Sequence, residues 1–269
     1  MTGRAAATAN EYEERAPTMT GTPQPTAATT ASSGTTTGTA NGGFDGVLFD
    51  CDGVLVDSEL ITNGVLREML HELGWAISAE DCVRLFIGRA LKDEWEVVLD
   101  RTGFRITDEW IARFRERRDE RLRAELTAIP GAREAVVAAS ERFAGRIAVA
   151  TGADLPKARM QLELTGLAPL FGDRVLSGMD QPRSKPAPDV YLAAAAAVGI
   201  DADRAIVVED TVSGTTAGVA AGATVLGFSP EGPTRTAPEA LRAAGAAAVF
   251  TRMDELPGLI DSISRRVTS

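Results

Sequence analysis

The sequence FDCDGVLVDS, residues 49–58, decides the fold of this chain. An apolar run ends here in Asp50 and Asp52, and Gly53 follows as the turn that terminates it. Side chains two residues apart on an extended backbone project to the same side, so both carboxylates face one pocket at a strand's carboxyl end, where open parallel sheets bind ligands. Paired acids repel each other unless a cation or a shared proton neutralises them. The pattern therefore predicts a strand over 46–49 and a pocket for a hard divalent cation.

Composition limits what kind of protein this is. The 269 residues are 44% apolar, which fits a globular chain with one substantial domain and a smaller inserted or appended one. A net charge of −10 argues against binding to nucleic acid or to an anionic membrane surface. No apolar run approaches the roughly 18 residues of a membrane span. The only two cysteines, Cys51 and Cys82, argue against a disulfide framework and lead us to expect a cytoplasmic protein.

Residues 1–43 differ from the rest of the chain. Thr, Ala, Gly, Ser and Pro dominate this stretch, and it lacks apolar periodicity. We expect a disordered tail, since such a composition buries too little apolar surface to fold. A signal peptide is not indicated, because the stretch has no apolar core of roughly 7–15 residues. The sequence leaves open whether Met1 or Met19 is the start.

From residue 44 onward, short apolar runs alternate with longer helical patterns. This order predicts right-handed βαβ units, and hence an α/β fold with a Rossmann-like, doubly wound parallel sheet covered by helices. Amphipathic stretches such as 155–165 and 188–198 supply helices between the strands. The predicted strands are 46–49, 146–150, 175–177, 205–208 and 224–228.

The first gap between strands is long and purely helical in pattern. We interpret residues 59–127 as an inserted α-helical cap domain, placed directly after the acidic motif, with hinges near 57–60 and 127–130. The α/β core then comprises 44–58 and 128–269. The predicted cap helices are 60–73, 80–86, 91–101 and 108–126.

Two more predicted strands end in groups that bind phosphate. Thr151 and Gly152 follow the second strand and precede a helix, so a hydroxyl and free backbone N–H groups can hold a phosphoryl oxygen there. Turns of this kind are also common without a function. Lys185, one of only three lysines, lies among prolines before a helix, which suggests an ammonium with a fixed role. The alternative is an ordinary exposed loop lysine.

A second acidic pair, Glu209 and Asp210, follows the fourth predicted strand. The pair is a candidate for cation binding at the same sheet edge as Asp50 and Asp52. Taken alone, it is equally explained by helix N-capping through Asp210 or Ser213.

Taken together, these four sites resemble the four motifs of the haloacid dehalogenase superfamily, in its branch of β-phosphoglucomutase-like and sugar-phosphate phosphatases. The motifs are DCDGVLVDSE at 50–59, Thr151-Gly152, Lys185-Pro186 and Glu209-Asp210, and the resemblance runs from about residue 44 to 250. The stretch 176–189 is also similar to the 6-phosphogluconate phosphatase members. The resemblance implies a phosphoric monoester hydrolase acting on a small phosphorylated metabolite, either a sugar phosphate or a phosphosugar acid. We expect it to be a monomer or a weak homodimer.

The resemblance also implies a role for each motif residue. Asp50 would be the nucleophile that forms an aspartyl-phosphate, and Asp52 would protonate the leaving oxygen and later deprotonate water. The implied cofactor, Mg²⁺, would be held by Asp50, the Asp52 backbone carbonyl and Asp210, with Glu209 helping directly or through water. The phosphoryl oxygens would be held by Thr151, the Gly152 N–H and Lys185.

The sequence allows two alternatives to this function. One is a phosphosugar mutase of the β-phosphoglucomutase type, but that family carries a histidine five residues after the motif's last aspartate, where this chain has Thr62. Another is a binding protein that keeps the fold without catalysis, which the intact motif set disfavours. The natural substrate is not specified, although Arg89 and Lys92 in the cap are candidate contacts.

Other polar residues have simpler interpretations. His71, the only histidine, is expected to be a solvated or packed cap residue. Residues 113–123, rich in Arg and Glu, are expected to form a solvated helix face with i,i+4 ion pairs. Cys51 is expected to point away from Asp50 and Asp52 into the core.

Overall fold

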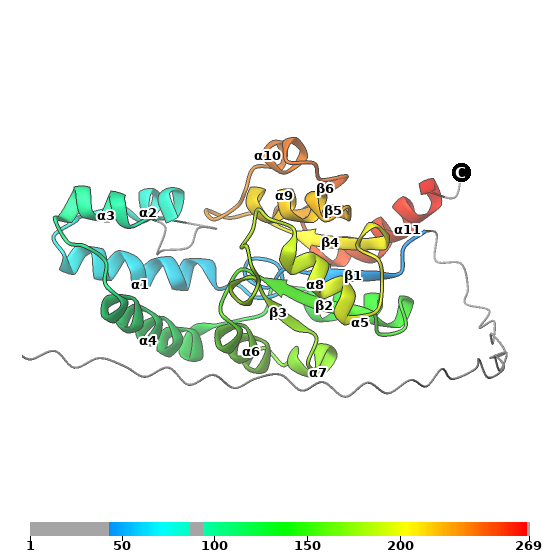
Figure 1. Ribbon diagram of the computed structural model, residues 1–269, viewed down its shortest axis with the longest axis horizontal. Helices are drawn as coiled ribbons and strands as arrows, with labels where there is room; N and C mark the ends of the chain where they lie inside the picture. The colour runs from blue at the N-terminus through cyan, green and yellow to red at the C-terminus, as the bar shows by residue number, and fades with distance from the viewer. Residues whose placement is uncertain (1–42, 87–93, 268–269) are drawn as a thin grey trace, which may run out of the picture. The chain divides into compact units, whose positions relative to one another are not determined.

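The computed structural model describes residues 43–86 and 94–267 (Figure 1). The predicted disordered tail, apart from its last residue, lies outside the described residues. So does the segment 87–93, which includes Arg89, Lys92 and the start of the predicted helix 91–101. Within the described ranges, no helix is both long enough and apolar enough to cross a bilayer.

The core is a six-stranded parallel sheet in the order β3-β2-β1-β4-β5-β6. β1 lies in the middle, between β2 and β4, and its four residues are fully buried. The sheet and five of its strands confirm the prediction, with bounds that differ by at most one residue at an end. The short β6 was not predicted. The strands are β1 (Gly46–Phe49), β2 (Ile147–Thr151), β3 (Val175–Ser177), β4 (Ala205–Glu209), β5 (Thr224–Phe228) and β6 (Ala248–Phe250).

Helices cover both faces of this sheet, as the doubly wound prediction requires (Figure 1). Alternation along β1 sends Phe49 to one face and Leu48 to the other. The Phe49 face packs against α5 (Ala132–Arg142), α6 (Leu155–Leu164), α7 (Ala168–Phe171) and α11 (Leu256–Val267). The Leu48 face packs against α8 (Asp189–Ala197) and α9 (Val212–Ala220), while α10 (Pro238–Ala243) lies beside β5 and β6. Short 3₁₀ turns occupy Gly178–Asp180, Ala202–Arg204 and Met253–Glu255.

Among the described residues, four α-helices lie between β1 and α5, where the cap was predicted. They share a separate apolar cluster that includes Leu66 and Met69 of α1, Phe86 of α2 and Trp110 of α4. We propose on this basis that 59–127, called the cap segment below, is a cap, and that 44–58 and 128–269 form the core. The helices are α1 (Glu59–Glu72), α2 (Ala79–Phe86), α3 (Trp95–Thr102) and α4 (Asp108–Glu125).

The two linkers that join the cap segment to the core run side by side. The backbone N–H of Asp57 donates to the Thr127 carbonyl at 3.0 Å, and the N–H of Ile129 donates to the Leu55 carbonyl at 3.0 Å. Val56 and Ala128 form an isolated antiparallel bridge between these bonds. Both chain crossings are therefore fixed just beyond the carboxyl end of β1, where the acidic motif lies.

We expect Leu48→Ala to destabilise the fold by about 2–5 kcal/mol, because it removes a fully buried side chain from the centre of the sheet. The matched control is Leu192→Ala on α8, where the leucine is 46% exposed and the cost should stay within about 0.5 kcal/mol. Urea unfolding of both variants measures the difference. Equal losses of unfolding free energy in the two variants would contradict the conclusion that Leu48 lies at the centre of the core.

Candidate active site

The end of β1 is held in place by its neighbours. The Asp50 N–H donates to the Val208 carbonyl of β4 at 3.0 Å, which continues the strand pairing up to the first acid. The chain then turns at Gly53, whose φ of +76° favours glycine. A Cβ at Gly53 would lie 2.2 Å from Oδ2 of Asp210. The glycine therefore lets the motif loop pass directly beside the second acidic pair.

Lys185 compensates the charge of the first acid. Its Nζ donates to Asp50 Oδ1 at 2.6 Å, to Glu209 Oε1 at 2.8 Å and to the Ala150 carbonyl at 3.0 Å. Burial raises the pKa of Asp50 to about 7, although the Lys185 ammonium acts in the opposite direction. Burial lowers the pKa of Lys185, but Asp50 and Glu209 outweigh it and hold that pKa well above its usual range. Lys185 therefore remains a cation between two carboxylates.

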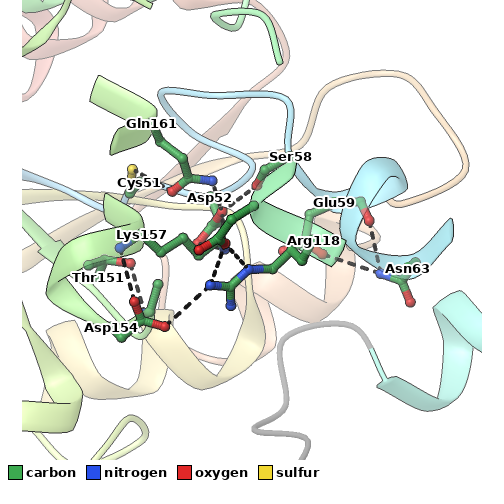
Figure 2. Close-up of polar contacts among 12 residues, drawn as sticks. Cys51, Asp52, Ser58, Glu59, Asn63, Arg118, Thr151, Asp154, Lys157 and Gln161 are labelled. Carbon is green, nitrogen blue, oxygen red and sulfur yellow. Dashed lines mark hydrogen bonds and ion pairs between the residues drawn. The ribbon is translucent and has the colours of Figure 1, made fainter. Parts of the chain in front are cut away.

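Asp52 has a separate set of partners (Figure 2). Lys157 Nζ donates to both of its carboxylate oxygens, at 2.8 and 2.9 Å, and Gln161 Nε2 donates to Oδ1 at 2.8 Å. The Ser58 hydroxyl donates to the same oxygen. Burial alone would raise the pKa of Asp52, but Lys157 and these hydrogen bonds outweigh it and lower the pKa to about 2. Two aspartates two residues apart thus differ strongly in acidity.

Sequence reasoning missed Lys157 and Gln161 as site residues. They lie four residues apart on α6, and therefore on one helix face, which points to Asp52. Both are buried, at 7% and 0% exposure. Asp154 fixes the start of the helix by accepting the Lys157 backbone N–H at 2.9 Å. Two polar side chains on the buried face of an amphipathic helix were the signal that could have identified them.

Cys51 lies in the apolar core cluster, as predicted, and is fully buried. Its Sγ donates to Gln161 Oε1 at 3.8 Å (Figure 2). The same glutamine therefore contacts both the cysteine and Asp52, and it links the motif loop to α6.

Glu209 and Asp210 have contrasting surroundings. Glu209 Oε2 accepts bonds from the Asp210 and Thr211 N–H groups and the Thr211 hydroxyl at 2.8–2.9 Å, while Oε1 accepts from Lys185 and Tyr191. Asp210 Oδ1 is buried and has no hydrogen-bond partner among the residues that the structure describes. Burial, and then the Glu209 charge, hold the pKa of Asp210 well above its usual range. No cationic side chain in 43–86 or 94–267 forms an ion pair with Asp210 to offset this effect.

Helix capping does not explain this acidic pair. The N-cap of α9 is Thr211, whose side-chain oxygen accepts the Gly214 N–H at 3.0 Å. The alternative assignment of the cap to Asp210 or Ser213 is therefore wrong. The carboxylate of Asp210 is left free for another role.

The oxygen donors at this edge of the sheet are suited to Mg²⁺. Among the residues that the structure describes, no three Asp, Glu, His or Cys side chains are grouped closely enough to hold a metal by themselves. Mg²⁺ does not need such a cage, since it usually keeps several waters and takes one or two protein carboxylates plus substrate oxygens. The orphaned oxygen of Asp210 is a carboxylate donor of that kind. The residues present therefore fit the ion.

Most of the predicted site residues share one cavity. Thr151 is fully buried, and its Oγ1 accepts the Ala153 N–H at 3.0 Å. Arg89 and Lys92, the predicted cap contacts, lie outside the described residues. The cavity has a volume of about 540 Å³, and its lining includes Asp50, Asp52, Thr151, Gly152, Lys185 and Glu209.

The opposite side of the cavity is lined by the cap segment. α1 contributes Glu59, Thr62, Asn63 and Leu66, α2 contributes Phe86, and α4 contributes Asp108, Ile111, Phe114, Arg115 and Arg118. His71 lies away from this lining, is exposed, and contacts the Ile77 carbonyl at 2.9 Å through Nε2. It is a cap residue without a place in the site, as expected.

The prediction of a solvated face over 113–123 is only partly correct. Arg117 pairs with Glu72 at 2.6 Å, and Arg121 pairs with Glu68 at 3.1 Å, so these bridges join α4 to α1 on the surface. Arg118 is instead buried and lies 3.5 Å from Oδ2 of Asp154 in the core (Figure 2). Arg115 lines the cavity. Arg115 is nevertheless exposed, so Arg118 is the residue that the charge pattern concealed, because it interrupts a row of outward side chains.

Comparisons with known proteins agree with this geometry. A family model described as a haloacid dehalogenase-like hydrolase matches residues 44–222. The chain is 32% identical over 188 residues to 6-phosphogluconate phosphatase of Escherichia coli K12, covering 69% of this chain and 82% of that protein. It is 30% identical over 182 residues to hexitol phosphatase B of the same strain, covering 65% and 78%.

A solved structure shows the same fold. A haloacid dehalogenase-like protein of unknown function from Agrobacterium tumefaciens superposes with a TM-score of 0.71 at 33% identity, covering 82% of this chain and 99% of that one. The family match spans all four motif sites, from the Asp50 loop to Asp210. The chain belongs to the haloacid dehalogenase-like hydrolases, and its relatives identify it as a phosphoric monoester hydrolase.

Proposed function

We propose that this protein hydrolyses the phosphate ester of a small phosphorylated sugar metabolite, through an aspartyl-phosphate on Asp50 and with Mg²⁺ as cofactor. The observation that carries the proposal is the separate compensation of two neighbouring aspartates, Asp50 by Lys185 and Asp52 by Lys157. Two acids in different environments can divide the roles of nucleophile and proton carrier. Relatives named for 6-phosphogluconate and hexitol phosphate hydrolysis support the substrate class.

In this mechanism Asp50 attacks phosphorus and the ester oxygen leaves. Thr151, the Gly152 N–H and Lys185 line the same cavity and would hold the other phosphoryl oxygens. Mg²⁺, held by Asp50, the Asp52 carbonyl and Asp210, would offset the repulsion between the carboxylate and the phosphoryl group. Glu209 already accepts five hydrogen bonds, so it would act through these or through a bridging water.

Asp52 would move the protons. It would protonate the leaving oxygen in the first half of the reaction and accept a proton from water in the second half. Its ion pair with Lys157 holds it as a carboxylate in the free enzyme, so the proton that it passes to the leaving oxygen would come from the bound phosphate monoester in its singly protonated form. Asp52 is then a carboxylate again, which is the form that the second half requires. Lys157 therefore keeps Asp52 deprotonated before the substrate binds.

Asp50→Asn should reduce phosphate release by at least about a thousandfold, because an amide is a poor nucleophile. The assay measures phosphate release from 6-phosphogluconate and from p-nitrophenyl phosphate. Circular dichroism checks that the variant is folded. Asp173→Asn on the surface is the matched control and should retain full activity. A folded Asp50→Asn variant with a tenth of the wild-type rate would rule out Asp50 as the nucleophile.

Removal of metal with EDTA should abolish phosphate release, and Mg²⁺ should restore it. Ca²⁺ should substitute poorly, because its larger and looser coordination shell disturbs in-line attack. Asp210→Asn should raise the Mg²⁺ concentration needed for half-maximal rate by about tenfold or more, since it removes a charged donor. Full activity in metal-free buffer would refute the metal part of the mechanism.

Lys157→Met should destabilise the protein by about 3–5 kcal/mol at pH 7, since it leaves the Asp52 carboxylate buried without a cation. Without Lys157, burial places the folded-state pKa of Asp52 above its unfolded value, so the loss should shrink as pH falls from 7 towards 4 and Asp52 binds a proton. Denaturant unfolding at several pH values measures this. The double variant Asp52→Asn, Lys157→Met should be more stable than the single one, and a pH-independent loss would refute the charge pairing.

We propose hydrolysis rather than phosphoryl transfer to a second sugar. Thr62 occupies the position of the histidine found in β-phosphoglucomutases, and it lines the cavity. Incubation with β-glucose 1-phosphate and a bisphosphate activator should therefore give glucose and phosphate, slowly, with little glucose 6-phosphate. Efficient formation of glucose 6-phosphate without phosphate release would favour the mutase instead.

A further inference from the structure

One face of α4 borders the active-site cavity. Asp108, Ile111, Arg115 and Arg118 follow one another at intervals of three or four residues, which is the spacing of a single helix face. All four line the cavity. Because α4 belongs to the cap segment, this face lies across the cavity from the groups at the end of β1.

Within the part of the chain that the structure describes, four cations line the cavity, and acids match three of them. Lys185 pairs with Asp50 and Glu209, Lys157 with Asp52, and Arg118 with Asp119 and Asp154. Arg115 differs from them: it lies at the exposed side of the cavity lining and has no hydrogen bond or ion pair with any residue in 43–86 or 94–267. A guanidinium without a partner in a concave site is suited to a carboxylate or phosphate of a ligand, which it can bind through two N–H groups.

The groups near this arginine narrow the choice of ligand. The cap side of the cavity also contains the carboxylates of Glu59 and Asp108, which would repel a dianionic second phosphate more than a carboxylate. These acids, Asn63 and Thr62 are suited to sugar hydroxyls. Thr62 Oγ1 is buried and finds no hydrogen-bond partner within the described ranges. Among the described residues, the cap side therefore offers the unmatched guanidinium of Arg115 together with several hydroxyl-binding groups.

We propose that Arg115 binds a carboxylate at the end of the substrate opposite its phosphate, so that this enzyme prefers phosphorylated polyhydroxy acids over the corresponding sugar alcohol phosphates. This inference rests on the proposed function and adds its substrate class. It assigns specificity to the cap and phosphoryl chemistry to the core. A cavity of about 540 Å³ has room for an open-chain six-carbon compound that reaches both sides.

The test compares 6-phosphogluconate with sorbitol 6-phosphate, which have the same chain except that a carboxylate in the first is a hydroxymethyl group in the second. The full-length wild-type protein with Mg²⁺ should show a kcat/KM at least about tenfold higher for the acid, as expected for a hydrogen bond between charged groups. Arg115→Gln should reduce this ratio to within about threefold, mainly by raising KM for the acid.

Arg113→Gln is the matched control. Arg113 lies on the same helix, its side chain is 54% exposed, and its nearest acid, Glu72, is 3.9 Å away, so this variant should keep the wild-type ratio. Arg115→Lys should keep part of the preference, since it retains the charge but loses the two-pronged geometry. A general defect in folding would lower both activities together and leave their ratio unchanged.

The outcomes separate this inference from the proposed function. Equal efficiency of the wild type on both compounds, or an unchanged ratio in Arg115→Gln, would overturn the carboxylate subsite and leave the phosphatase in place. If the wild type released no phosphate from either compound or from p-nitrophenyl phosphate, the proposed function would fall. Equilibrium binding would then decide the subsite: tighter binding of the acid that Arg115→Gln abolishes would support it, and equal binding would refute it.

Discussion

The rest of the site depends on how the two carboxylates at the end of the central strand are neutralised. Asp50 and Asp52 leave a fully buried β1, so the fold has to provide cations without breaking the core. It does so with two lysines from different parts of the chain: Lys185 from the segment before α8, and Lys157 from α6. The parallel order β3-β2-β1 brings the segments that follow β2 and β3 to the same edge of the sheet as the acidic motif after β1. The topology of the sheet therefore determines which cations neutralise the two aspartates.

The same arrangement connects the cap segment to the proton carrier. Asp154 accepts the Lys157 backbone N–H and so caps α6, and its carboxylate also lies beside Arg118 of α4 (Figure 2). α6 in turn presents Lys157 and Gln161 to Asp52. A short series of polar contacts thus runs from the cap to the acid that we propose as the general acid and base. These contacts connect the cap segment, which we propose selects the substrate, to the core residues that we propose carry out the chemistry.

The sequence was sufficient for features that depend on local periodicity. Alternation along a strand predicted that Cys51 turns inward from Asp50 and Asp52, and short apolar runs predicted the sheet. Contacts that depend on tertiary packing were beyond it. Lys157 and Gln161 are polar side chains that a helix buries only because Asp52 lies opposite. Arg118 differs from the exposed arginines of α4 only in the direction in which the helix turns its side chain. β6 is three residues long and has a weak apolar signal.

The most direct test of the central claim, that Asp50 carries the phosphoryl group during turnover, is chemical trapping of the intermediate. Borohydride reduces an aspartyl-phosphate to homoserine, which peptide mass spectrometry can assign to one position. The account predicts homoserine at position 50 when the protein is quenched during steady-state hydrolysis, and an unmodified aspartate when substrate is omitted. Homoserine at another aspartate, or phosphate release with no trapped residue at position 50, would contradict it.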